Sequence, residues 1–322
     1  MSRIYEALLK AEQDRATAKT EQATTAEGTA AGGTTAVDEV VEATAMPHPV
    51  MAPFASTAVT STRIPEMAVR VGGIPDLMPA VTAVWRPKMT KLLALQSAGS
   101  HVEQFRSLRS KLFEFRDLNK LKTIMVGSGM PGEGKSFVAL NLAVSFARHK
   151  SARVLLIDGD LRRSTQHKVL GAAHEPGLAE YLAGKATLGQ VLYRGTDQEG
   201  AAFPPGLSTL TFIPSGEAGD RAADLSGSPL FGELIKTLSP QFDWIIVDSS
   251  PVNLVTDGVN LARSCDGVLL IARGGVTKYE TAQRAITELK ASEILGLVLN
   301  AVNDEDIPDN YYGYGGYDSL QA

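Results

Sequence analysis

The 322-residue chain holds a single cysteine, and this scarcity excludes two kinds of site. Cys265 has no second cysteine to pair with, so neither an intramolecular disulfide nor a zinc site built from several cysteines can form. Such sparing use of cysteine is typical of proteins from a reducing compartment. A small buried side chain is the simplest interpretation of Cys265.

The chain also lacks a long apolar run and a strong charge of either sign. No stretch reaches the roughly 18 to 20 consecutive apolar residues that a membrane-spanning helix needs, and the polar beginning has no signal-peptide core. We therefore expect a cytoplasmic protein. The formal net charge of −5 gives no overall attraction to polyanions, so we expect no nucleic-acid partner.

Residues 16–90 lack the patterns of regular structure. They are rich in Ala, Thr, Gly and Pro, and proline removes a backbone donor and fixes φ. We expect a disordered tether over this range. The prolines concerned are Pro47, Pro49, Pro53, Pro65, Pro75, Pro79 and Pro87.

Residues 1–15 have a helical pattern of their own. Ile4, Tyr5, Leu8 and Leu9 fall on one side of a short helix, with charged residues elsewhere. Two interpretations stay open. The apolar stripe docks on a partner, or the helix frays and has no function.

The rest of the chain has the sequence pattern of an α/β domain. With 44% hydrophobic residues, the chain can form a sizeable core. Continuous apolar runs separated by helical patterns indicate a mainly parallel β-sheet flanked by helices on both faces. We assign this domain to residues 91–303 and a flexible tail to residues 304–322. The expected strands are 123–126, 154–157, 210–213, 244–247, 268–272 and 295–299.

An amphipathic helix is expected over residues 101–118, directly before the first of these strands. Its apolar residues recur at helical spacing, and its charged face carries Glu103, Arg106 and Arg109. The apolar positions are Val102, Phe105, Leu108, Leu112 and Phe115.

A phosphate-binding loop follows the first strand of the domain. The segment GMPGEGKS, residues 129–136, fits the pattern G-x-x-x-x-G-K-[S/T] and leads into a helical sequence. Its glycines allow backbone amides to turn inward onto phosphate oxygens. We expect Lys135 to reach the β- and γ-phosphates of ATP and Ser136 to bind Mg²⁺. The candidate nucleotide-binding residues are Gly129, Gly132, Glu133, Gly134, Lys135, Ser136 and Phe137.

Aspartates follow two other strands at the same expected edge of the sheet. Asp158 and Asp160 lie in VLLIDGDLRR, and Asp248 lies in WIIVDSSP. A single aspartate at a strand end is more often a helix cap or a turn residue. Carboxylates beside a phosphate loop need a cation, however, so the three together predict a magnesium site.

Taken together, these motifs resemble the bacterial tyrosine kinases, or BY-kinases, that control capsule and exopolysaccharide synthesis. The resemblance covers roughly residues 101–317 and rests on EQFRSLR, the phosphate loop, IDGDLRR, IIVDSSP and a tyrosine-rich end. MinD and ParA ATPases have a similar P-loop NTPase fold but carry an extra lysine early in the loop. That position is Met130 here, which favours the kinase interpretation.

The resemblance implies transfer of the γ-phosphoryl group from ATP to tyrosine. It implies that Lys135 neutralises the charge of the β- and γ-phosphates. It also implies that Mg²⁺ is bound, directly or through water, by Ser136, Asp160 and Asp248. Asp158 is then expected to accept the tyrosine proton, because a free tyrosine has a pKa near 10 and needs a base. ATP and Mg²⁺ are the expected cofactors.

The tail supplies candidate acceptors of the phosphoryl group. Tyr311, Tyr312, Tyr314 and Tyr317 stand among glycines and aspartates. In the family, such tails are phosphorylated by a neighbouring subunit within a ring. The alternative is a low-complexity segment whose aromatic residues make it adhesive.

The ExxRxxR motif makes Glu103, Arg106 and Arg109 candidates for the interface of that ring. The alternative is an ordinary solvated helix face, in which the i,i+3 pair of Glu103 with Arg106 would suffice.

The resemblance also implies partners. A separate membrane-bound polysaccharide co-polymerase or activator would recruit the chain to the inner face of the cell membrane, and a cognate tyrosine phosphatase would reverse the reaction. Two other functions stay open: a MinD/ParA-like ATPase switch, and a non-catalytic, nucleotide-dependent scaffold.

Three further residues have two interpretations each. Arg162 and Arg163 either guide phosphate or an acidic partner, or belong to a solvated turn. Asn300 ends the last expected strand and either contacts adenine, as in related ATPases, or caps a turn.

Overall fold

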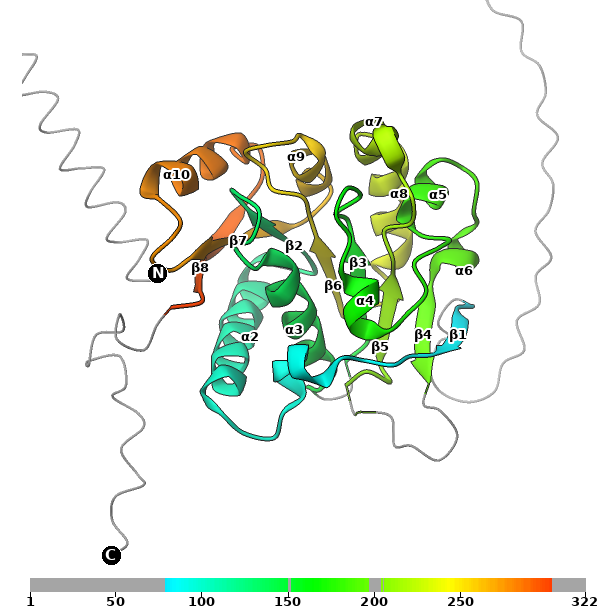
Figure 1. Cartoon of the computed structure of the whole chain (residues 1–322), viewed down its shortest axis with the longest axis horizontal. Helices are drawn as coiled ribbons and strands as arrows, with labels where there is room; N and C mark the ends of the chain where they lie inside the picture. Colours follow the sequence, from blue (N-terminus) through cyan, green and yellow to red (C-terminus); the bar gives the residue numbers. More distant parts are fainter. Residues whose placement is uncertain (1–78, 150–151, 197–203, 205, 303–322) are drawn as a thin grey trace, which may run out of the picture. The chain divides into compact units, whose positions relative to one another are not determined.

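In the computed structural model of the protein, the described residues are 79–149, 152–196, 204 and 206–302 (Figure 1). The expectations for residues 1–15 and for most of the tether lie outside this range. So do those for Tyr311, Tyr312, Tyr314 and Tyr317.

An eight-stranded sheet forms the centre of the described domain. Its strand order is β1-β4-β5-β3-β6-β2-β7-β8. Every neighbouring pair is parallel except β4 with β5, so the prediction of a mainly parallel sheet is confirmed. The strands are β1 (Val81–Val84), β2 (Thr123–Ser128), β3 (Val154–Asp158), β4 (Tyr193–Thr196), β5 (Leu210–Ile213), β6 (Trp244–Asp248), β7 (Gly267–Arg273) and β8 (Ile294–Asn300).

Helices cover both faces of this sheet (Figure 1). None of those in the described ranges combines the length and the apolar character that crossing a bilayer requires. The α-helices are α2 (Ser100–Asn119), α3 (Lys135–Ala147), α4 (Gln166–Leu170), α5 (Leu178–Leu182), α6 (Leu188–Val191), α7 (Ala222–Ser226), α8 (Pro229–Leu238), α9 (Asp257–Ala262) and α10 (Tyr279–Glu288).

The central strands are mainly apolar because they bury both of their faces. In β2, Ile124 and Val126 belong to the core on the side of α2 and α3, whereas Met125 belongs to the core on the side of α8 and α9. Because alternate residues point to opposite faces and both faces are buried, apolar residues are favoured at successive positions of such a strand. This explains why the central strands could be found from sequence.

Helix α3 lies between the sheet and α2, and it is buried on all sides from Val138 to Ala147. Aromatic side chains join the two helices. The ring centroids of Phe105 and Phe137 are 6.1 Å apart. Such burial holds α3, and the loop at its start, in a fixed position against the sheet.

The last part of the expected tether belongs to the sheet instead. Residues 81–84 form β1, which pairs with β4, and Trp85 is buried edge-on against Phe212 at a centroid distance of 6.3 Å. The high proline content of the preceding segment concealed this strand. Pro79 and Pro87 flank β1 without interrupting it, and a flanking proline removes no ladder hydrogen bond.

Candidate active site

The carboxyl ends of β2, β3 and β6 meet at one edge of the sheet. Asp158 and Asp248 are paired residues of β3 and β6, and Asp248 is also paired with Val126 near the end of β2. Ile157 and Val247 pack in the core on the side away from α3. The aspartates that follow them therefore point to the α3 side, because side chains alternate along a strand.

The phosphate loop lies between β2 and α3, as the motif predicted. Gly132 and Gly134 have φ values of +81° and +96°, which residues with a Cβ rarely adopt. A Cβ on Gly134 would lie 2.0 Å from Nδ2 of Asn300, so a larger residue here would displace the Asn300 side chain. The thirteen-residue helix α3 begins at the next residue and directs the positive end of its dipole at the loop.

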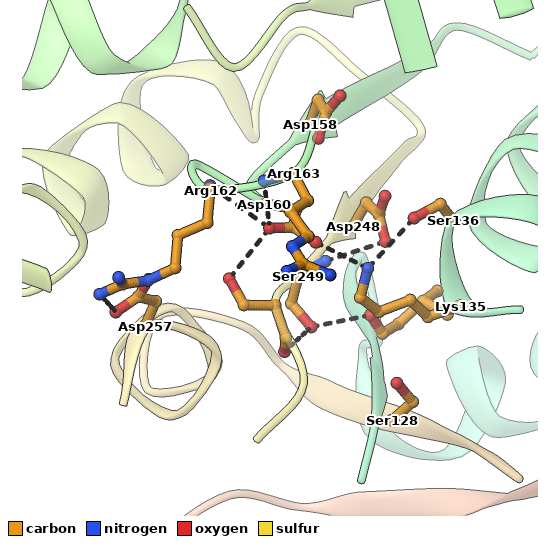
Figure 2. Close-up of polar contacts among 12 residues, drawn as sticks. Ser128, Lys135, Ser136, Asp158, Asp160, Arg162, Arg163, Asp248, Ser249 and Asp257 are labelled. Atoms are coloured by element: carbon orange, nitrogen blue, oxygen red, sulfur yellow. Dashed lines mark hydrogen bonds and ion pairs between the residues drawn. The ribbon is translucent and has the colours of Figure 1, made fainter. Parts of the chain in front are cut away.

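Lys135 is held among the strand-end carboxylates (Figure 2). Its Nζ lies 2.8 Å from Oδ2 of Asp160 and 3.2 Å from Oγ of Ser136. Burial alone would lower the pKa of Lys135, but the carboxylates of Asp248 and Asp160 outweigh this effect, and the pKa is raised. The side chain therefore keeps its positive charge although only 12% of it is exposed.

Asp160 joins the second and third motifs. Its Oδ1 accepts hydrogen bonds from the backbone N of Arg163 at 3.0 Å and from Oγ of Ser250 at 3.3 Å, while Oδ2 faces Lys135. The side chain of Asp160 is only 4% exposed. The turn after β3 and the turn after β6 are thus fixed relative to the loop lysine.

Gln166, which sequence reasoning missed, connects the ends of β3 and β6 with the start of α3. Its Nε2 donates to Oδ2 of Asp248 and to the backbone O of Ser136, each at 2.9 Å, and its backbone N donates to Oδ2 of Asp158 at 3.2 Å. Gln166 is 1% exposed. The only signal in the sequence is a polar residue shortly after the second motif, which does not distinguish it from a surface glutamine.

The buried carboxylates fit a divalent cation. Oδ1 of Asp158 has no hydrogen-bond partner in the described residues, although the residue is fully buried. Burial, then the charges of Asp248 and Asp160, raises the pKa of Asp158 well above its ordinary value. With all three aspartates ionised, Lys135 would leave two negative charges unbalanced. Mg²⁺ prefers oxygen ligands and would balance them.

Glu133 and Asn300 support the loop through bonds within the protein. The Glu133 carboxylate accepts from the backbone N of Met130 at 2.8 Å and from the hydroxyl of Thr277. Nδ2 of Asn300 donates to the backbone O of Glu133 at 2.9 Å. The Glu133 side chain thus shapes the loop, and Asn300 at the end of β8 is tied to the same loop.

Arg162 is engaged with a buried acid and does not lie free beside the loop. Its Nε and Nη2 lie 2.6 and 3.3 Å from the two carboxylate oxygens of Asp257, the first residue of α9. Arg163 is exposed. Arg162 is exposed as well, as the solvated-turn interpretation predicted, and its ion pair ties the turn after β3 to α9.

The three residues of the ExxRxxR motif lie on α2, apart from this site. Arg106 forms an ion pair with Glu103, as the solvated-face interpretation predicted. Nη1 of Arg109 instead donates to the backbone O of Ser145 in α3 at 2.7 Å. Arg109 therefore also fixes α2 on α3.

Comparison with known proteins identifies a family for the larger part of the chain. Residues 124–312, which are 189 of the 322 positions, match the family described as the CobQ/CobB/MinD/ParA nucleotide binding domain. The phosphate loop and both aspartate motifs lie within the matched range.

Two curated relatives are named tyrosine-protein kinases. CpsD of Streptococcus pneumoniae serotype 4 is 36% identical over 198 residues, which are 61% of this chain and 81% of CpsD. Wzc of Salmonella typhimurium is 29% identical over 248 residues, which are 76% of this chain. The chain spans only about a third of the length of Wzc, since those residues are 33% of that protein.

A solved structure of the same kind has the same fold. The kinase domain of the Escherichia coli tyrosine kinase ETK superposes with a TM-score of 0.60 at 30% sequence identity. The superposition covers 66% of this chain and 80% of the ETK chain.

Proposed function

Because the chain belongs to the CobQ/CobB/MinD/ParA nucleotide-binding family and, within it, to the bacterial tyrosine kinases, we propose that it transfers the γ-phosphoryl group of ATP to tyrosine. The observation that carries this proposal is the meeting of Lys135 with the strand-end carboxylates Asp160 and Asp248. Phosphoryl transfer depends on positioning and on charge stabilisation, and such a site can supply both.

ATP is held by the phosphate loop and the start of α3 in this proposal. The left-handed glycines turn backbone amides inward, and Lys135 neutralises the β- and γ-phosphate oxygens. Asn300, which lies against Gly134, is the proposed adenine contact. The nucleotide-binding set is Gly129, Gly132, Glu133, Gly134, Lys135, Ser136, Phe137 and Asn300.

Ser136, Asp160 and Asp248 are the proposed magnesium ligands, directly or through water. Bound Mg²⁺ supplies charge shielding for the transferring phosphoryl group. The protein prepares this position by bonding Asp248 to Gln166 and Asp160 to Ser250, so that the carboxylates are oriented in advance.

Asp158 is the proposed base that takes the proton from the attacking tyrosine hydroxyl. Burial, then the charges of Asp248 and Asp160, raises the pKa of Asp158. This brings the pKa of Asp158 closer to that of the tyrosine hydroxyl whose proton it accepts. Asp158 is fully buried in this structure. The role therefore requires that the turn after β3 opens to admit the tyrosine.

The proposed acceptors are the tail tyrosines of a neighbouring subunit in a ring. They are Tyr311, Tyr312, Tyr314 and Tyr317. Glu103, Arg106 and Arg109 of α2 contribute to the contact between subunits. Phosphorylation adds close to two negative charges at each tyrosine, so repulsion between tails would release the subunits from the ring.

The biological setting that we propose is control of exopolysaccharide or capsule synthesis and export. The relatives named above are tyrosine-protein kinases, and the motifs of this chain resemble those of kinases that control such synthesis. A membrane-bound activator would recruit the chain to the inner face of the membrane, and a cognate phosphatase would remove phosphate from the tail tyrosines.

Incubation of the full chain with ATP labelled at the γ-phosphate separates this function from the alternatives. Label on the tail tyrosines is expected. Release of labelled phosphate without protein labelling would instead indicate an ATPase switch, although Met130 stands where MinD and ParA carry their extra lysine. Nucleotide binding with neither product would indicate a scaffold.

A further inference from the structure

A basic cavity of about 160 Å³ opens between α2 and α3, remote from the phosphate loop. Figure 1 shows the two helices side by side. Three arginines line the cavity: Arg106 and Arg109 from α2, and Arg148 just after α3. The rest of its wall is formed by Ala94, Val102, Ser145 and His149. Three guanidinium groups around so small a space form a site for an anion.

These guanidinium groups are held in place without being neutralised. Nη1 of Arg109 bonds to the backbone O of Ser145, and Nη1 of Arg148 bonds to the backbone O of Ala94 and, at 3.0 Å, of Gln96. Neither Arg109 nor Arg148 forms an ion pair with any residue that the structure describes. Bonds to carbonyl groups orient an arginine but leave its charge uncompensated.

The cavity therefore carries an excess of positive charge. Among the residues that the structure describes, the ion pair at this cavity is that of Arg106 with Glu103, which is 64% exposed and so contributes little in water. Burial, then the charges of Arg106 and Arg148, lowers the pKa of Arg109. An anion in the cavity would relieve this mutual repulsion.

The chain itself contains a segment of matching charge. Residues 303–322 include five acidic residues and no lysine or arginine. Four of the five, Asp304, Glu305, Asp306 and Asp309, come directly before the tyrosines. We propose that the basic cavity is a docking site for this acidic stretch, residues 304–309, from the tail of a second copy of the chain. The proposal rests on the tail being the substrate of the neighbouring subunit.

Docking in the cavity would bring the later tyrosines within reach of the active site. Ser145 follows Lys135 by ten residues on α3, which corresponds to about 15 Å along the helix. Tyr314 and Tyr317 follow Asp309 by five and eight residues, which can span up to about 17 and 26 Å when extended. The acidic stretch would thus bind in the cavity, and the tyrosines that follow it would enter the active site.

A synthetic peptide of residues 303–322, added to the full chain, tests this docking site. Fluorescence anisotropy should show salt-dependent binding, and Arg106→Gln should weaken it about tenfold, as loss of one charge-assisted contact would. A peptide with residues 304, 305, 306 and 309 changed to the matching amides should bind at least tenfold more weakly, although its tyrosines are intact. Arg284→Gln, on the exposed face of α10, removes the same charge elsewhere and should have no effect.

In the kinase reaction, Arg148→Gln should raise the KM for the peptide and leave kcat unchanged, because Arg148 lines the cavity but lies outside the proposed contact between subunits. Light scattering must give both proteins the same mass, so that loss of a ring is not mistaken for loss of docking. Equal binding of the acidic and amide peptides would overturn the proposal, and so would binding of inorganic phosphate without binding of the peptide. Because anisotropy needs no turnover, peptide binding by a chain that phosphorylates nothing would support docking while the kinase function fails.

Discussion

Asp158 and Asp248 are paired residues on the adjacent parallel strands β3 and β6, and Gln166 donates a hydrogen bond to each of them. The sheet register alone therefore brings two buried carboxylates together. A third, Asp160, reaches the same place through its bond to Lys135. The site therefore forms where the strands end, and side chains such as Gln166 fix the positions of its carboxylates before a ligand binds.

Gln166→Ala should weaken binding of Mg·ATP without unfolding the protein. The change removes the two bonds of Nε2, to Asp248 and to the backbone O of Ser136, and a buried bond of this kind contributes about 1–3 kcal/mol. Isothermal titration calorimetry would measure the loss. Gln283→Ala, at an exposed position on α10, is the control and should bind as the wild type does. Unchanged affinity in Gln166→Ala would mean that the bridge does not position Asp248.

Asp158→Asn should abolish most tyrosine phosphorylation while ATP still binds. The amide keeps an oxygen that can accept from the backbone N of Gln166, but it cannot take a proton. General-base catalysis contributes roughly 10²- to 10⁴-fold, so kcat should fall by that factor. Phosphotyrosine formation at wild-type rate, with normal ATP affinity, would remove Asp158 from the role of base.

Two glycines of the phosphate loop offer a matched comparison. A methyl group on Gly132 meets open space, whereas one on Gly134 would lie 2.0 Å from Nδ2 of Asn300. Both positions have positive φ, so both alanine variants carry backbone strain of order 1–3 kcal/mol. Gly134→Ala should in addition displace Asn300 and should therefore lower the affinity for ATP more than Gly132→Ala does. Thermal unfolding and nucleotide binding check the two effects, and equal ATP affinities would contradict the role given to Asn300.

Trp85→Ala should destabilise the domain although Trp85 lies in the stretch whose composition suggested a tether. Its side chain is 3% exposed and packs on Phe212, and removing a buried aromatic ring costs about 3–5 kcal/mol. Trp85→Phe keeps an apolar ring and should lose less. Chemical denaturation measures both free energies of unfolding. If Trp85→Ala unfolded like the wild type, β1 would contribute nothing to the domain.

The parts of the fold that could be predicted were those in which local sequence and burial agree. Strands β2, β3 and β6 bury both faces, so their sequences are mainly apolar and lead into polar motifs. The glycines and Lys135 of the phosphate loop follow from the chemistry of phosphate contacts. Each of these features is determined by neighbours in sequence.

The parts that could not be predicted depend on contacts distant in sequence. Strand β4 is a four-residue strand with three half-buried positions, so its sequence has no apolar run. Glu133 resembles any loop carboxylate, and its bond to Thr277 crosses 144 positions. The pairing of Arg162 with Asp257 spans 95 positions and gives no local pattern. Side chains of this kind become visible only once the strands are ordered in the sheet.

The central claim is that the Lys135 site transfers phosphate to tyrosine in the chain's own tail. Mass spectrometry of the full chain incubated with Mg·ATP, beside the Lys135→Met variant, tests it most directly. We expect phosphotyrosine among Tyr311, Tyr312, Tyr314 and Tyr317 in the wild type and none in the variant. A wild-type tail that stays unmodified while the protein hydrolyses ATP, or a variant tail phosphorylated equally well, would contradict the account.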